Sequence, residues 1–140
     1  MLVPDGNMLR QFLSASESGE RLRARVDASG DDASLTVVTI EESMRGWLAE
    51  LNRRSINPHG QIEVYRRMHT SVEVFAKWTV LAWDVESSDL FLKLRRDGVR
   101  IGTHDLKIAC ITLAHDALLL TRNTVDFAQV PGLRFENWAD

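Results

Sequence analysis

The chain has 140 residues, a usual size for one domain and too short for two separate hydrophobic cores. Hydrophobic residues make up 44% of it, so a packed core is expected rather than disorder. The net charge of −3 excludes a generally basic surface for nucleic acid, so any polyanion would have to be held locally, by a metal or a few arginines.

Cysteine content and apolar run lengths limit the compartment. Cys110 is the single cysteine, which excludes an internal disulfide and fits a reducing cytosol; its apolar helical surroundings indicate packing rather than reactivity. No apolar run reaches the roughly 20 residues that span a bilayer, and the N-terminus lacks a signal-peptide pattern. We therefore expect a cytoplasmic protein that does not enter a membrane.

The N-terminal part begins with short elements. They are an entry strand over 1–4, a turn over 5–7, a helix over 8–13 and a second helix over 20–27. The run Leu35–Ile40 is β-branched and almost continuously apolar, which is typical of a central parallel strand.

From Glu41 onward the apolar period becomes helical. Helices over 43–53 and 60–77, separated by Asn57–Gly60, predict either an antiparallel hairpin or an arm. The remaining expected elements are a strand over 80–83, a helix from 90 to about 98, a helix beginning near 103, a strand over 117–121, and a loop-like tail with an extended piece near 133–135.

Strands therefore alternate with helices along the chain. That order favours right-handed βαβ units, so we predict an α/β fold with a mostly parallel central sheet between helix layers. The sequence contains no internal repeat, linker or low-complexity segment, which predicts a single domain over 1–140.

Acidic residues follow predicted strands or open the next helix. They are Asp5, Glu42, Asp105 and Asp126. Ligands bind beyond the carboxyl ends of strands in open α/β sheets, so all four could converge at one edge. Close carboxylates raise one another's pKa, and a divalent cation between them would relieve this repulsion. Oxygen-only ligands favour Mg²⁺ or Mn²⁺ over zinc. Such ions activate water and stabilise charge on a phosphodiester.

Each acid also has a purely structural interpretation. Asp5, or either of Thr103 and Asp105, could cap the following helix, and Glu42 in a first helical turn would suit the helix dipole. Asp126 could serve a turn. Capping does not require all four carboxylates at one sheet edge, so the set as a whole favours a metal site.

Two histidines are alternative general bases, because imidazole titrates near neutral pH. They are His104 and His115. His104 is adjacent to Asp105, but on a helix its side chain would point about 100° away. His59 and His69 are expected at the surface.

The C-terminal third carries a family resemblance. Gly102–Ala109 (GTHDLKIA) and Thr121–Leu133 (TRNTVDFAQVPGL), followed by Glu136-Asn137-Trp138, resemble PIN-domain proteins of the VapC toxin type. This block is the most specific part of a resemblance that covers almost the whole chain.

Two earlier segments resemble other blocks of the same family. Val38–Gly46 is similar to the second block, whose spacing selects Glu42 rather than Glu41 as the acid. Asp5–Leu9 resembles the first block, an aspartate followed by a small hydroxyl residue, then Asp or Asn, then apolar positions.

The resemblance implies a three-layer α/β/α PIN-like domain and a Mg²⁺- or Mn²⁺-dependent ribonuclease acting as an endonuclease. The family's catalytic and metal-binding acids would fall on Asp5, Glu42, Asp105 and Asp126, with Asn7, Thr121 and Asn123 as accessory polar residues. Asp126 would lie in an outer shell or hold a second metal. Asn123 would contact metal-bound water, and Thr121 would orient Asp5 by a hydrogen bond.

The resemblance also implies partners. Such toxins are typically homodimers, and a small antitoxin that inserts into the active-site groove inhibits them. We therefore expect an RNA substrate, a cognate antitoxin and a homodimer, as the toxin of a type II toxin–antitoxin pair. The arginines that could line a groove for RNA are Arg45, Arg53, Arg54, Arg66 and Arg67, although solvated helix faces are their simpler interpretation.

Two residues depart from the family's first block. Gly6 replaces the usual Thr or Ser and removes a hydroxyl, while Pro4 lacks the N–H that a central strand would use. They motivate an alternative hypothesis, a catalytically impaired PIN-like module that binds a protein or RNA without cleavage. A receiver-like or nucleotide-binding domain is disfavoured, because the chain has no glycine-rich phosphate loop.

Overall fold

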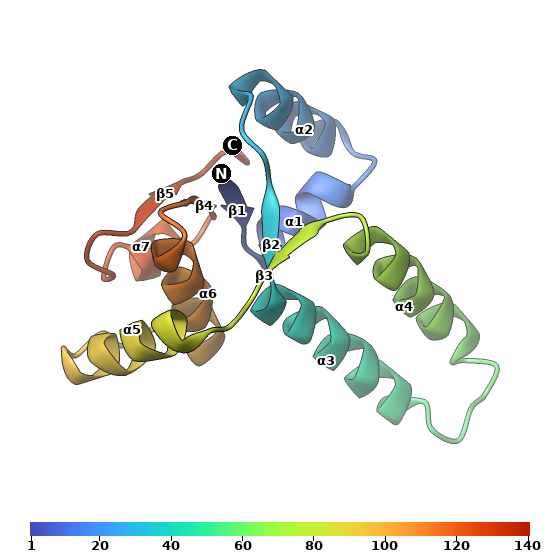
Figure 1. Ribbon diagram of the computed structural model, residues 1–140. Coiled ribbons are helices and arrows are strands. Elements are labelled where there is room, and N and C mark those ends of the chain that lie inside the picture. The colour runs from blue at the N-terminus through green and yellow to red at the C-terminus, as the bar shows by residue number, and fades with distance from the viewer.

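The computed structural model describes residues 1–140 and contains five short strands and seven helices (Figure 1). The strands are β1 (Leu2–Pro4), β2 (Ser34–Thr36), β3 (Thr79–Leu81), β4 (Leu118–Leu120) and β5 (Arg134–Glu136). The helices are α1 (Gly6–Leu13), α2 (Glu17–Ser29), α3 (Val37–Arg53), α4 (Ile62–Phe75), α5 (Val85–Arg96), α6 (Thr103–Ala114) and α7 (Thr124–Phe127).

Every strand pair is parallel. β4 lies between β1 and β5, while β2 pairs separately with β3. One isolated parallel bridge, between Leu2 and Ala33, connects the two ladders, and the Leu2 N–H donates to the Asp32 carbonyl at 2.8 Å. Across this bridge the strand order is β3-β2-β1-β4-β5. The predicted mostly parallel sheet is confirmed.

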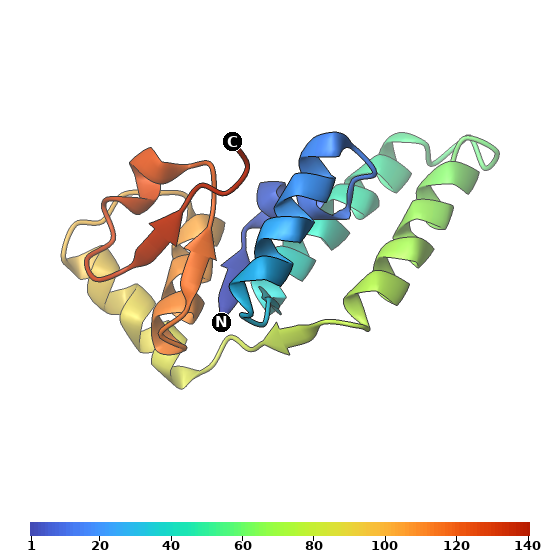
Figure 2. The same cartoon turned by 90° about the horizontal axis from the view of Figure 1, so that it is seen from above.

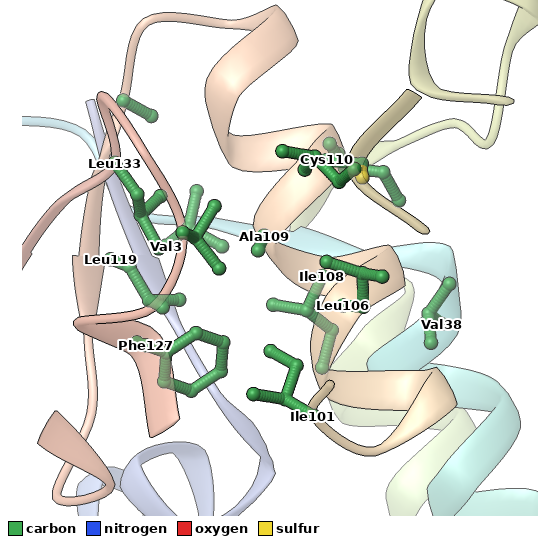
Figure 3. Close-up of a cluster of buried hydrophobic side chains, with 14 of the residues drawn as sticks. Val3, Val38, Ile101, Leu106, Ile108, Ala109, Cys110, Leu119, Phe127 and Leu133 are labelled. Atoms are coloured by element: carbon green, nitrogen blue, oxygen red, sulfur yellow. The ribbon is translucent and has the colours of Figure 1, made fainter. Parts of the chain in front are cut away.

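Helices cover both faces of β1 and β4, because successive side chains of a strand point to opposite faces. Leu2 and Leu120 pack in one buried cluster with residues of α1 and α2. Val3 and Leu119 belong to a larger cluster on the other face, toward α6 (Figure 3). The three-layer α/β/α arrangement is therefore confirmed.

Helix α6 forms the centre of the larger cluster. Its Leu106, Ala109 and Cys110 are fully buried, and Phe127 of α7 lies across from this helix (Figure 3). Burial raises the pKa of the Cys110 thiol to about 11. The thiol is therefore protonated at neutral pH, which agrees with the packing role expected for this cysteine.

Helices α3 and α4 form an antiparallel hairpin that extends away from the strands (Figure 1, Figure 2). The Gln61 side-chain amide donates to the Leu51 carbonyl at 3.1 Å and joins the two helices near the turn. The two arrangements considered from the sequence, a hairpin and an arm, are thus combined in one element. No helix of the chain has the length and apolar character needed to cross a membrane.

The boundary between β2 and α3 differs from the prediction. The strand expected over 35–40 ends at Thr36, and α3 begins at Val37. The Thr36 hydroxyl accepts a hydrogen bond from the Thr39 N–H at 3.1 Å, as a helix N-cap does. A continuous apolar run has no period that distinguishes a strand from a helix, so the capping residue Thr36 determines where α3 begins. Glu42 consequently lies in the second turn of α3 rather than directly after a strand.

Smaller differences concern other element boundaries. The turn expected over 5–7 is instead the start of α1, with Asp5 as its cap. Helix α2 begins at Glu17, earlier than expected, because the Ser16 hydroxyl accepts from the Gly19 N–H at 3.2 Å. Helix α7 lies between the strand expected over 117–121 and the loop-like tail expected from Phe127, and apolar spacing did not predict it.

Pro4 lies within β1 without interrupting its pairing with β4. The Asp5 N–H, directly after it, donates to the Leu120 carbonyl at 3.0 Å. Backbone groups alternate sides along a strand, so Pro4 faces the same side as Leu2. That side is paired through the single Leu2–Ala33 bridge, so the missing N–H leaves the β1–β4 ladder intact.

Truncating Phe127 should destabilise the fold strongly. Its ring is 0% exposed, so Phe127→Ala removes buried apolar surface and leaves a cavity between α6 and the sheet. We expect a loss of ~3–4 kcal/mol in the free energy of unfolding by urea denaturation. Val125→Ala is the matched control, because Val125 in the same helix is 80% exposed. Equal effects of the two substitutions would contradict the packing described for α7.

Candidate active site

Asp5 is fixed at the carboxyl end of β1 through both of its side-chain oxygens. Pro4 pairs with Leu120 in the parallel register, so Asp5 and Thr121 follow two adjacent strands. Asp5 Oδ1 accepts from the Met8 N–H at 2.8 Å, and Oδ2 accepts from the Thr121 hydroxyl at 2.5 Å. The capping role considered for Asp5 is therefore correct, and the hydrogen bond expected from Thr121 is present as well.

Glu42 reaches the same region from α3. A Cβ atom at Gly6 would lie 3.8 Å from Glu42 Oε2, so the starts of α1 and α3 are in contact here. Glu42 Oε1 is buried and has no hydrogen-bond partner. An unpaired buried carboxylate oxygen is costly, which indicates that a further donor or a cation belongs beside it.

Asn123 connects the remaining acids. Its side-chain amide donates to Asp126 Oδ2 at 2.9 Å and lies 3.5 Å from Asp105 Oδ2. Its backbone N–H donates to Thr121 Oγ1 at 2.9 Å, so the same residue is also linked to Asp5 through Thr121. Asp105 lies in the first turn of α6 as predicted, but neither it nor Thr103 caps that helix.

The electrostatics confirm that these acids interact. Burial raises the pKa of Glu42, and the charges of Asp105 and Asp5 raise it further, while His104 lowers it. Burial also raises the pKa of Asp105, with added contributions from Asp5 and Asp126, while the Asn123 hydrogen bond lowers it. The four predicted acids therefore form one network, in which neighbouring carboxylates oppose the ionisation of Glu42 and Asp105.

The chemistry of this network fits a hard divalent cation. Carboxylates and a carboxamide supply oxygen donors, which Mg²⁺ and Mn²⁺ prefer, and the unpaired Glu42 Oε1 is available for ligation. Their oxygens do not form a closed cage, because no three Asp, Glu, His or Cys side chains of the chain are grouped as a cation site. The residues that could hold a metal are Asp5, Glu42, Asp105 and Asp126.

Sequence reasoning missed a side-chain pair beside the acids. His104 Nε2 lies 3.3 Å from Glu41 Oε1, and Arg45 lies 3.0 Å from the other oxygen of Glu41. This contact joins α3 to α6 next to the two acids that follow Glu41 and His104 in the sequence. The sequence signal for this pair was that Glu41 directly precedes Glu42 and that His104 directly precedes Asp105.

Asn7 is exposed, and its side-chain oxygen accepts a hydrogen bond from Arg10 at 3.4 Å. Its side chain therefore contacts a cation and not one of the acids.

Known proteins resemble this chain in sequence and fold, although no family model matches it. Ribonuclease VapC2 of Rickettsia felis is 40% identical over 50 residues, which cover 36% of this chain and 37% of that protein. The tRNA(fMet)-specific endonuclease VapC of Salmonella typhimurium is 25% identical over 119 residues, 85% of each chain. The DNA-bound VapBC crystal structure from Salmonella typhimurium has a TM-score of 0.74 at 19% identity, covering 98% of this chain and 97% of that one. The resemblance to VapC-type proteins is confirmed.

Restoring a hydroxyl at position 6 should relieve Glu42. Gly6→Ser places its Oγ within reach of Glu42 Oε2, because the Cβ atom would be 3.8 Å from that oxygen. A donor to the charged form lowers a carboxyl pKa. We expect the Glu42 pKa, measured by carbon-13 NMR titration, to be lower in Gly6→Ser than in Gly6→Ala, which adds the methyl without the donor. Identical values in the two variants would show that the positions do not communicate.

Stability should depend on pH through Asp105. Its folded-state pKa is raised above the ordinary 3.8, so its contribution to stability is present below the unfolded pKa and is lost as pH rises through the folded pKa. The Asp105→Asn side chain cannot ionise, so the variant does not lose this stability as the pH rises. In EDTA, the variant should therefore gain stability relative to the natural protein as pH rises above the ordinary pKa of 3.8. Urea denaturation across this range is the measurement, and a constant difference would contradict the raised pKa.

Proposed function

We propose that this protein is a VapC-like ribonuclease that hydrolyses RNA phosphodiester bonds with Mg²⁺ or Mn²⁺, as the toxin of a type II toxin–antitoxin pair. The observation that carries the proposal is the single network of Asp5, Glu42, Asp105 and Asp126 beyond the ends of β1 and β4. The names of the two sequence relatives, a ribonuclease and an endonuclease, support the same activity.

Each side chain has a role in this proposal. Asp5, Glu42 and Asp105 hold the cation, and Asp126 supports them from the outer side through Asn123. When bound, the cation would lower the pKa of a water molecule and stabilise the charge that develops on the phosphodiester. Thr121 keeps the Asp5 carboxylate oriented by donating to Oδ2.

The acids also set where a proton can go. The pKa of Glu42 is raised, so the carboxylate oxygen that does not hold the cation can accept a proton from an attacking water. In-line attack of that water on phosphorus would break the bond to the RNA 3′-oxygen, and the leaving oxygen would take up a proton from solvent. The products would carry a 5′-phosphate and a 3′-hydroxyl.

A second candidate function rests on Gly6. A side chain at this position would begin 3.8 Å from Glu42 Oε2, so glycine leaves the first motif without a hydroxyl that could support that oxygen. In that case the protein would be a catalytically impaired PIN-like module that binds a protein or RNA without cleavage. Cation binding and RNA cleavage together distinguish the two, because the impaired module would do neither.

The proposed partners are an RNA substrate, a cognate antitoxin and a second copy of the chain. The VapBC structure from Salmonella typhimurium is a DNA-bound complex and shares the fold of this chain. An antitoxin that covers the carboxylate network would block RNA access directly. The homodimer is proposed on the family resemblance alone.

Replacing Asp105 by Asn should abolish cleavage. The substitution keeps the size of the side chain while removing a negative oxygen ligand, so cation binding weakens and Mn²⁺-supported RNA cleavage falls by more than ~100-fold. Thr121→Val, which removes the donor to Asp5, should cost ~10–100-fold. Cleavage is followed on labelled RNA, and Mn²⁺ affinity by calorimetry.

Asp89→Asn is the matched control, because Asp89 is an exposed acid on α5 with no recorded hydrogen bond or ion pair. It should cleave and bind Mn²⁺ as the natural protein does. Full metal-dependent cleavage by Asp105→Asn, with its circular dichroism unchanged, would remove Asp105 from the proposed site.

A further inference from the structure

Glu42 differs from the other three acids in how it is held. Hydrogen bonds through Thr121 and Asn123 link the other three, which are Asp5, Asp105 and Asp126. Glu42 makes no hydrogen bond or ion pair with any of them, and its Oε1 is buried without a partner. The position of Glu42 relative to the other acids therefore depends on how α3, the helix that carries it, is held.

Helix α3 meets α6, the helix that carries Asp105, through an apolar and a polar contact. Val38 of α3 and Leu106 of α6 belong to one buried cluster (Figure 3). Three residues after Val38, Glu41 Oε1 lies 3.3 Å from His104 Nε2, and no other hydrogen bond or ion pair joins the two helices. We refer to these two side chains as the Glu41–His104 clamp. Apolar contact is non-directional, so the clamp is what fixes one point of α3 relative to one point of α6.

Each residue of the clamp directly precedes an acid of the network. Glu41 precedes Glu42, and His104 precedes Asp105. Successive residues of a helix point about 100° apart, so the clamp side chains face the neighbouring helix while the two acids face the network. A rotation of either helix that broke the clamp would also turn Glu42 or Asp105 away from the other acids.

Arg45 restrains the acid of the clamp. It follows Glu41 by four residues on α3, and its guanidinium lies 3.0 Å from Glu41 Oε2. Glu41 is therefore held through both oxygens, by Arg45 within its own helix and by His104 across to α6. A similar contact of an acid with an imidazole, between His69 and Glu73 at 3.0 Å, lies within α4 and joins no two helices.

Neither folding stability nor charge accounts for the clamp. The side chains of His104 and Glu41 are 32% and 39% exposed, and pairs this accessible to solvent contribute little to stability. Burial raises the pKa of Glu42, and beside that effect His104 lowers this pKa while Glu41 raises it, so the two charges act in opposite directions. What the contact supplies without such cancellation is a fixed placement of α3 against α6.

We propose that Glu41 and His104 are positioning residues, whose contact holds Glu42 and Asp105 at the separation that one divalent cation requires. The inference rests on the proposed function, because it concerns the same cation site. Neither residue of the clamp binds the cation or RNA. Arg45 acts one step further out, by fixing the side chain of Glu41.

Calorimetric Mn²⁺ affinity, measured at one fixed pH, tests the role of the clamp. His104→Ala should weaken Mn²⁺ binding about tenfold, because the contact between the helices is lost. The direction of this change is diagnostic. Imidazole carries no negative charge, so if charge were its role, removing it would leave cation binding unchanged or make it tighter. His104→Gln, whose amide can still donate to Glu41, should bind Mn²⁺ nearly as the natural chain does.

The acid of the clamp gives a second comparison. Glu41→Ala removes both the charge and the acceptor and should weaken Mn²⁺ binding about tenfold. Glu41→Gln keeps an acceptor for His104 without the charge, so it should retain most of the affinity. Equal losses in Glu41→Ala and Glu41→Gln would overturn the positioning role. Because the two side chains act through one contact, the double variant Glu41→Ala/His104→Ala should bind no more weakly than either single variant.

His69→Ala is the matched control, because it breaks a contact of the same kind within α4. It should bind Mn²⁺ as the natural chain does. Urea denaturation of each variant in EDTA reports folding separately. A clamp with a merely structural role would lower stability and leave the Mn²⁺ affinity of the folded protein unchanged, which would overturn the inference.

The outcomes also separate this inference from the proposed function. Unchanged or tighter Mn²⁺ binding in His104→Ala, with binding still weakened in Asp105→Asn, would overturn the clamp and leave the nuclease proposal standing. Weaker binding in the clamp variants of a chain that never cleaves RNA would support the clamp and refute the nuclease. A natural chain that binds no Mn²⁺ would refute both.

Discussion

Parallel pairing of β1 with β4 brings two segments far apart in the sequence together at Asp5 and Thr121. The register places Pro4 opposite Leu120, so the next residue of each strand carries a functional side chain. A hydrogen bond of 2.5 Å then closes the pair, and the backbone of Asn123 binds the same threonine oxygen. The remaining acids are positioned relative to this pair by the starts of α3 and α6.

Mutual repulsion is the cost of this arrangement. Burial and neighbouring charge raise the pKa of both Glu42 and Asp105, and one oxygen of Glu42 has no donor. The fold tolerates this because the core on both faces of the sheet is fully packed around Leu2, Val3 and Leu119. Local electrostatic strain supported by packing elsewhere is typical of functional sites, since a ligand can then recover the energy on binding.

The sequence was sufficient for the fold class, because strand–helix alternation is a local pattern. It also indicated that Asp5, Glu42, Asp105 and Asp126 lie near one another, while their catalytic and metal-binding roles stay predictions. It misplaced the start of α3, where the capping hydroxyl of Thr36 overrides a β-branched run. The sequence could not predict contacts between elements that lie far apart along the chain. The pairing of Glu41 with His104 depends on how α3 and α6 pack together.

The central claim is that Asp5, Glu42 and Asp105, from three separate segments, hold one divalent cation with Asp126 in support. Titrating nitrogen-15-labelled protein with Mn²⁺ tests it most directly, because the paramagnetic ion broadens nearby NMR signals. The account predicts that the Asn123 side-chain amide and the backbone amides of Asp5 and Asp105 broaden first, well before those of α5 or the hairpin turn. Broadening that begins elsewhere, or that affects all exposed acids equally, would contradict it.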